Sequence, residues 1–365
     1  MDNSELKAIL KEYMRIPRLS GYEKEMAYRY QSDMKRYTED VRIDRIGNVI
    51  AAFPGTDASA PSIMIFAHMD TIGFVVTCIT EQGFLRLDRV GGVPEKALQG
   101  LQVYVGNEEG KYFNGVIGMR SYHTQSPKDK EKADSLSELF VDIGAKSRQE
   151  VTGLGIEVGC PVIYANHYCE LLNDRIAGTY TDDASGLTSM LHVASMLKEN
   201  KTKATVYLVG TVMEEFNARG AMLAQRSVHA DMAICLLGAG AGDTPDLAGS
   251  NNVRLGEGVS ITLFNFHGKG TLNGNIAHSG MFSLMQKAAK AAGIPLQRQA
   301  GRGALTDSAY LQLEDMGVPC LDMGTPDRYS HSPLEVLELK DLYRTGVLVY
   351  TFIDALTQDF NCRRY

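Results

Sequence analysis

Acidic and histidine side chains follow several strand-like segments of the sequence, and these are the residue types that bind divalent metals or move protons. In open α/β sheets the ligand crevice lies outside the carboxyl ends of the strands, so side chains at these ends gather at one edge. The side chains that follow such segments or precede a helix beside them are His68, Asp70, Asp182, Asp183, Glu214, Glu215 and His331. We therefore expect one site at the edge of a sheet.

Each of these residues has a simpler explanation when it is taken alone. A single histidine such as His68 or His331 is more often a hydrogen-bonded structural residue than a metal ligand. Asp182 and Asp183 before a helix would serve as its N-cap, and an acidic pair at a helix start is favoured by the helix dipole. Four segment ends that all carry metal-capable side chains are better explained by one shared site.

Two histidines with several carboxylates and no cysteine form a ligand set that suits Zn²⁺, Co²⁺ or Mn²⁺. In the adjacent pair Glu214 and Glu215, one carboxylate can bind the metal while the other serves as general base for a metal-bound water. Asp70 follows His68 by two residues, which places it to orient that imidazole or another ligand. The sequence therefore predicts a metal site that activates water.

Composition narrows the class of protein. The chain has 365 residues, of which 44% are apolar and 22% charged, as expected for one large or two linked globular domains. A net charge of −7 argues against a nucleic-acid or anionic-membrane partner. Six cysteines without a CxxC pair, no signal peptide and no apolar stretch of ~20 residues predict a reduced, cytoplasmic location without a membrane span.

The elements that must position these residues alternate between helices and buried strands. Amphipathic patterns predict helices over 4–14, with Ser4 as the cap, and over 24–37. This alternation, which returns after residue 180, predicts an α/β fold with a largely parallel sheet flanked by helices. The predicted strands lie at 62–67, 204–213 and 232–237, and the further helices at 184–200, 217–227, 282–293 and 341–356.

Residues 72–163 show a different pattern. Short segments of alternating polarity, separated by turns that contain glycine, predict an all-β module. A polar stretch at 121–135 interrupts the module and is predicted to be a loop. We predict a discontinuous α/β domain of residues 1–71 and 164–365, into which this β-rich domain is inserted.

Six segments, in their order and spacing, resemble the tetrahedral metallo-aminopeptidases, a family that includes glutamyl and deblocking aminopeptidases and some members labelled as endoglucanases. The likeness covers nearly the whole chain. It implies a zinc-peptidase-like fold in which the β module is the dimerisation domain, and dimers that assemble into a hollow dodecamer. The six segments are AHMDTIGF (67–74), LFVDIGAKSRQE (139–150), TDDASGL (181–187), EEFNARGA (214–221), AGDTPD (241–246) and RYSHSPLEV (328–336).

The resemblance also implies a role for each site residue. Asp182 would bridge two ions, Glu214 would be the general base, and Asp70 would orient the bridging ligand. The implied activity is that of an aminopeptidase that uses one or two ions of zinc or cobalt, or manganese, to remove N-terminal residues from short peptides. The implied metal ligands are His68, Asp182, Glu215 and His331.

One position departs from the pattern of the family. The family has an aspartate at the end of the strand 232–237 as the third protein ligand of the ion at His68, and this chain has Leu237 there. The change removes a coordination bond and a negative charge, so we expect nearer one tight ion per subunit than two. Cys235 lies about 6.5 Å further back along the strand, too far to compensate.

Two other classes of function stay open on the sequence. A catalytically impaired assembly or binding homologue is favoured by Leu237, although the retained Glu214 speaks against it. A glycoside hydrolase also uses paired carboxylates, but this chain has no tryptophan for a sugar platform and pairs its acids with histidines. Sensitivity to a chelator separates a metallopeptidase from such a glycosidase.

Overall fold

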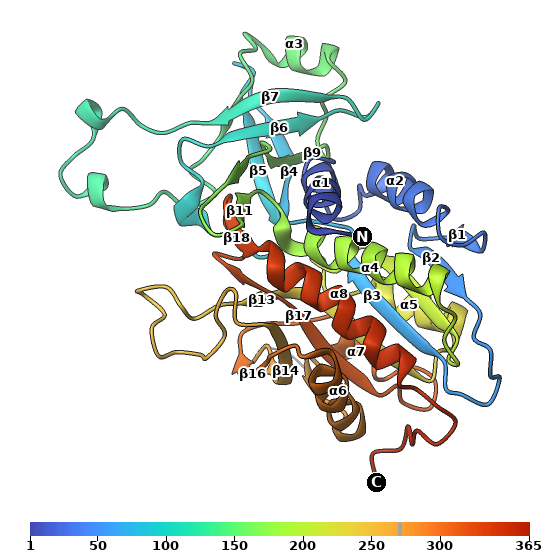
Figure 1. The fold of residues 1–365 in the computed structure, drawn as a ribbon. Coiled ribbons are helices and arrows are strands. Elements are labelled where there is room, and N and C mark those ends of the chain that lie inside the picture. Colours follow the sequence, from blue (N-terminus) through green and yellow to red (C-terminus); the bar gives the residue numbers. More distant parts are fainter. Residues whose placement is uncertain (269–271) are drawn as a thin grey trace.

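The apolar runs predicted as strands lie in one mixed sheet of twelve strands (Figure 1). The structure is a computed structural model and describes residues 1–268 and 272–365. The strands β12, β3, β13 and β17 are parallel neighbours at the centre of the sheet. The order along the sheet is β1 (Val41–Ile43), β2 (Val49–Phe53), β12 (Val206–Thr211), β3 (Ile63–His68), β13 (Met232–Gly240), β17 (Cys320–Arg328), β18 (Glu335–Glu338), β11 (Arg175–Gly178) and β10 (Tyr168–Glu170).

Three further strands extend the sheet beside β17. The strand β14 pairs antiparallel with β17 and parallel with β16, and β15 pairs with β14. The antiparallel strands at both sides leave the parallel pairing confined mainly to the centre, which is also where the sheet is most buried. These three strands are β14 (Val259–Phe266), β15 (Gly274–Ile276) and β16 (Leu296–Arg302).

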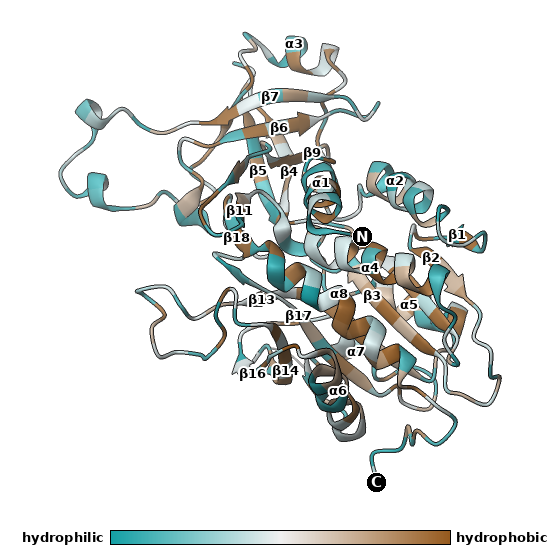
Figure 2. Ribbon diagram, in the orientation of Figure 1, coloured by the Kyte–Doolittle hydropathy of each residue, from teal (hydrophilic) through white to brown (hydrophobic). Residues whose placement is uncertain are grey.

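Helices cover both faces of the sheet, and their apolar sides form its core (Figure 2). Side chains of β3 alternate between the faces: Ile65 packs in the cluster with α1, α4, α6 and α8, whereas Phe66 packs in the cluster with α5 and α7. The helices are α1 (Asn3–Tyr13), α2 (Lys24–Met34), α4 (Thr181–Glu199), α5 (Gly220–Val228), α6 (Ser279–Ala292), α7 (Ser308–Leu311) and α8 (Leu339–Asp354).

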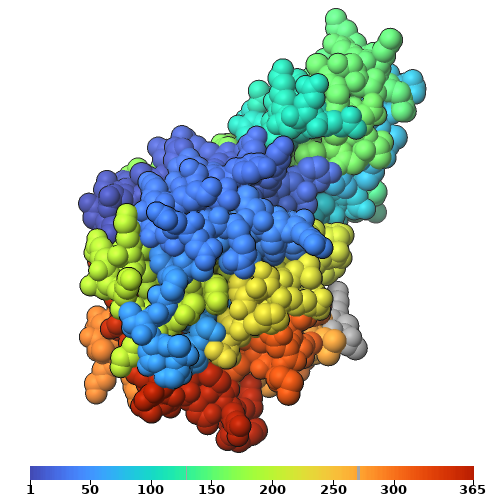
Figure 3. Space-filling model, turned by 90° about the vertical axis from the view of Figure 1, so that its right-hand side faces the viewer, coloured from blue at the N-terminus to red at the C-terminus, as the bar shows by residue number. Residues whose placement is uncertain are grey.

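A closed β-barrel, formed by the chain between β3 and β10, stands out from the α/β body (Figure 3). Its apolar side chains form a core of their own, separate from the cores of the sheet. The long β7–β8 connection contains only two short 3-10 turns, η2 (Tyr122–Thr124) and η3 (Asp129–Glu131). The barrel elements are β4 (Gly73–Ile79), β5 (Leu85–Val90), η1 (Glu95–Ala97), β6 (Gln102–Gly106), β7 (Tyr112–Ile117), β8 (Val141–Asp142), α3 (Arg148–Gly153) and β9 (Pro161–Tyr164).

The predicted fold class, a largely parallel sheet flanked by helices with an all-β module between its segments, is confirmed. The predicted cap of α1 is wrong by two residues: the side chain of Asp2 accepts hydrogen bonds from the backbone of Ser4 and Glu5, and the Glu5 carboxylate binds the Asp2 N–H in return. The second helix ends at Met34 rather than at residue 37. Of the helices described, none is both long and apolar enough to cross a bilayer.

Close contact between β13 and β17 depends on Gly324, which pairs with Leu237. A Cβ atom at Gly324 would lie 1.7 Å from the Leu237 carbonyl oxygen, whereas one at Gly301 would meet nothing within 4 Å. We expect Gly324→Ala to lower the free energy of unfolding by about 2–3 kcal/mol, because two buried strands must separate. Gly301→Ala is the matched control and should change it by less than about 0.5 kcal/mol. Urea unfolding followed by circular dichroism measures both, and equal stability of the two variants would contradict the prediction.

Candidate metal centre

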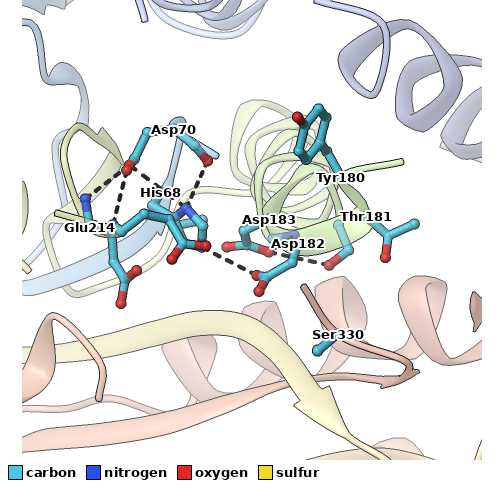
Figure 4. Close-up of polar contacts among 12 residues, drawn as sticks. His68, Asp70, Tyr180, Thr181, Asp182, Asp183, Glu214 and Ser330 are labelled. Atoms are coloured by element: carbon cyan, nitrogen blue, oxygen red, sulfur yellow. Dashed lines mark hydrogen bonds and ion pairs between the residues drawn. The ribbon is translucent and has the colours of Figure 1, made fainter. Parts of the chain in front are cut away.

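His68 ends β3 and directs one ring nitrogen at a carboxylate. Its Nδ1 lies 3.0 Å from the backbone oxygen of Asp70, and its Nε2 lies 3.2 Å from Asp182 Oδ1 (Figure 4). A carbonyl oxygen only accepts, so this contact assigns the proton of a neutral imidazole to Nδ1 and leaves a lone pair on Nε2. A lone pair that faces a carboxylate oxygen repels it unless a cation or proton lies between them. This is an orientation in which an imidazole can bind a metal ion.

His331 is oriented in the same way from another part of the chain. Its Nδ1 lies 3.1 Å from the backbone oxygen of Gly92, which belongs to the segment between β5 and β6 of the barrel. Its Nε2 lies 3.5 Å from Asp182 Oδ2 and 3.6 Å from Glu215 Oε1. The two oxygens of Asp182 thus face one imidazole each, which is the geometry of a bridging carboxylate.

Asp183 does a different task from its neighbour. Its carboxylate accepts hydrogen bonds from the backbone of Gly186 and the hydroxyl of Ser185, at 2.7 and 3.2 Å. It therefore holds the first turn of α4, while Asp182 faces the histidines; both lie inside α4, whose N-cap residue is Tyr180, rather than before the helix. Burial raises the pKa of Asp183 to about 8.

Asp70 is fully buried and fixes the backbone of the glutamate pair. Its two carboxylate oxygens accept hydrogen bonds from the N–H groups of Glu214 and Glu215, both at 2.9 Å (Figure 4). The imidazole of His68 is oriented by the backbone oxygen of Asp70, while the carboxylate of Asp70 lies 3.7 Å from it. Asp70 therefore positions the residues on either side of the site through different atoms.

Glu335, which the sequence did not single out, joins the two arms that carry Asp182 and His331. Its carboxylate accepts hydrogen bonds from the Asp182 N–H at 2.9 Å, from the Thr181 hydroxyl at 3.0 Å and from the His331 N–H at 2.7 Å. The residue is almost completely buried. The only signal in the sequence was a carboxylate four residues after His331.

Arg18 is a buried cation beneath the site, and no pattern in the sequence indicated it. Its side chain is fully buried and donates hydrogen bonds to the backbone oxygens of Met69 at 2.8 Å and Tyr180 at 3.0 Å. Met69 directly precedes Asp70, and Tyr180 lies two residues before Asp182. Among the described residues no carboxylate lies within ion-pair distance of Arg18, so its charge acts on the site through space.

The charges of the site are unbalanced without a cation. Burial alone would lower the pKa of His331, but Glu215 and Asp182 outweigh it and raise the pKa to about 11. Burial raises the pKa of Glu215 to about 7, against the opposing effect of His331. Both shifts favour the protonated forms of these side chains, so a divalent ion that bound there would compete with protons.

Two groups of ligand atoms satisfy the spacing of a metal site. Asp182, Glu215 and His331 form one group, and the other is formed by His68, Glu214 and Glu215; within each, the ligand atoms lie within 4.8 Å of one another. Nitrogen and carboxylate oxygen donors suit zinc, cobalt or manganese. The structure thus brings all the predicted ligands together.

The strand β13 adds no ligand to this site through Leu237 or Cys235. Leu237 carries an apolar side chain that packs against the cluster around α5, and Cys235 is buried in the same cluster. Neither of the two groups of ligand atoms contains Cys235. Counting from the paired residues Cys235 and Phe66, Leu237 is the neighbour of His68 on the adjacent strand.

Known proteins resemble this chain over most of its length. A family model described as M42 glutamyl aminopeptidase matches residues 47–348. The protein SgcX of Escherichia coli is 38% identical over 324 residues, which are 89% of this chain and 87% of that protein. The aminopeptidase APDkam598 of Desulfurococcus kamchatkensis superposes with a TM-score of 0.91 at 33% identity, covering 98% of this chain and 97% of the other. The TET1 peptidase of Pyrococcus horikoshii, described as assembling into a tetrahedron or a large octahedral shell, gives a TM-score of 0.85 at 27% identity, covering 96% and 100%.

The three hydrogen bonds of Glu335 predict a measurable effect on metal affinity. We expect Glu335→Ala to weaken binding of Co²⁺ about 10- to 100-fold, because the backbones of Asp182 and His331 lose their common acceptor. Glu335→Gln keeps one acceptor oxygen, so its affinity for Co²⁺ should lie between the affinities of Glu335→Ala and the parent. Calorimetric titration of the metal-free protein measures the affinity. Glu338→Gln, on the same strand but bonded to Arg175, is the control; unchanged affinity in a folded Glu335→Ala protein would refute the role.

Proposed function

Because the chain belongs to the M42 glutamyl aminopeptidase family, we propose that it is a metal-dependent aminopeptidase that removes N-terminal residues from short peptides. One observation carries the proposal: two imidazoles, each fixed at Nδ1 by a backbone carbonyl, direct Nε2 at opposite oxygens of Asp182. Glu215 lies within ligand distance of the same point. We assign the tight ion to Asp182, Glu215 and His331.

The proposed chemistry is hydrolysis by a water molecule. A divalent ion held by Asp182, Glu215 and His331 would supply a Lewis acid for the scissile carbonyl and for a water molecule. In this proposal Glu214 would accept the proton of that water and deliver it to the leaving amine. Burial raises the pKa of Glu214 well above its usual value, the direction expected for a carboxylate that must hold a proton before it passes it on.

Asp70 and Glu335 act as positioning residues in this proposal. Asp70 holds the backbone of the proton acceptor Glu214 and of the ligand Glu215. Glu335 holds the backbone of the ligands Asp182 and His331. Neither contact uses a ligand atom, so both carboxylates can stay in place while substrate and products exchange.

We further propose that residues 1–71 and 164–365 form the catalytic unit and that the barrel region, 72–163, is the dimerisation unit. The assembly described for the TET1 peptidase supports a homo-oligomer, and the separate core of the barrel supports its independence from the sheet. The Nδ1 contact of His331 with Gly92 adds a direct link between the barrel and the proposed ligands.

Removal of the proton acceptor should stop the reaction without removing the metal. We expect Glu214→Gln to lower kcat on aminoacyl p-nitroanilides by about 10²–10⁴-fold, and EDTA to abolish the activity of the parent until Co²⁺, Zn²⁺ or Mn²⁺ is added back. Glu12→Gln, on the exposed side of α1, is the control. Equal turnover by Glu214→Gln and the parent would end the catalytic proposal, and no turnover by the metal-loaded parent would favour an impaired homologue.

The side chain at position 237 should set the number of tightly bound ions. We expect the parent to retain about one ion per chain after dialysis and Leu237→Asp to retain about two, because the new carboxylate would lie beside His68. Leu237→Asn has the same shape without the charge and serves as the control. Elemental analysis measures the metal content, and two equally tight ions in the parent would refute the prediction.

A further inference from the structure

The second group of ligand atoms, formed by His68, Glu214 and Glu215, is not the ion site that the resemblance implies for His68. That site would use Asp182 and a carboxylate at position 237, where this chain has Leu237. The structure instead places ligand atoms of both glutamates within 4.8 Å of His68 and of each other. The described residues contain no other group of three such ligands beyond the one around His331.

Glu214 is free to join this group. Its backbone N–H donates to Asp70, whereas no donor among the described residues reaches its carboxylate. The Asp70 contact fixes the backbone of Glu214 next to His68 and leaves its side chain available (Figure 4). A neutral imidazole and two carboxylates give a charge of −2, which matches a divalent cation.

The residues opposite His68 on its two neighbouring strands carry no carboxylate. Thr211 pairs with His68 on one neighbouring strand. On the other, Cys235 pairs with Phe66, and counting on by two residues puts Leu237 opposite His68. Neither Thr211 nor Leu237 can supply a negative charge. Asp182 Oδ1 also faces His68, but its second oxygen faces His331 and is shared with the first group.

We propose that this chain has a second, weaker site for a divalent cation at His68, Glu214 and Glu215, and that filling it inhibits the enzyme. The inference rests on the proposed function, in which Glu214 is the proton acceptor. A carboxylate bound to a cation has given up the lone pair that would take a proton from water. The site is weaker because it shares Glu215 with the first ion and lies beside that ion's charge.

Titration of the metal-free, full-length protein with Co²⁺ tests the proposal, with calorimetry and the visible absorption of Co²⁺ as readouts. The parent should show one tight event and a second on the order of 100-fold weaker. Glu214→Gln should keep the tight event and lose the weak one. The double variant Leu237→Asp/Glu214→Gln should regain a second event, because a carboxylate other than Glu214 then adjoins His68.

Activity provides an independent readout. Turnover of leucine p-nitroanilide by the parent should rise with the first equivalent of Co²⁺ and fall over the concentration range of the second event, whereas Leu237→Asp should show no fall. A weak event that persists in Glu214→Gln, or parent activity that stays constant while it occurs, would overturn the inference. A parent that binds no Co²⁺ would instead overturn the proposed function.

Discussion

The constraint on which the site depends is the crowding of carboxylates at one buried edge of the sheet. A buried negative charge is costly unless a donor or a cation lies next to it. Backbone N–H groups answer part of this need, through Asp70 beneath the glutamate pair and Glu335 beneath Asp182. Arg18 adds a fixed positive charge and binds backbone carbonyls of the two segments that carry Asp70 and Asp182. These donors do not reach the carboxylate oxygens of Asp182 and Glu215 that face the two histidines. A divalent ion would neutralise the negative charge of these oxygens.

The sheet provides this edge because its central strands are parallel. Thr211 and His68 pair at the ends of β12 and β3, so the residues that follow both strands lie side by side. The start of α4 brings Asp182 from the helical layer, and the turn after β17 brings His331. The barrel also contributes, since the carbonyl of Gly92 fixes the tautomer of His331. An inserted module that orients a proposed metal ligand cannot be treated as an accessory of the fold.

The sequence predicted the strand ends well because a buried parallel strand is an apolar run, and the polar residue that ends it is visible by contrast. It therefore singled out His68, Glu214 and Glu215, while the predicted start of a helix singled out Asp182. It could not find Arg18, because a buried arginine that binds carbonyls leaves no periodic pattern and its partners lie 51 and 162 residues away. Nor could it tell which of Asp182 and Asp183 faces the histidines. The two residues are identical in type, and only the backbone at the start of α4 directs their side chains to different partners.

Position 237 shows how the demands of the fold and of the proposed site oppose each other. A leucine there packs against the apolar cluster around α5, and its backbone pairs with Gly324 on the neighbouring strand β17. A carboxylate in its place would lose this packing and add one more negative charge near His68. With a leucine, the metal-free chain avoids that cost and gives up a ligand for an ion at His68. The same substitution therefore favours the stability of the empty protein and disfavours its double occupation by metal, so stability and metal content must change in opposite directions at this position.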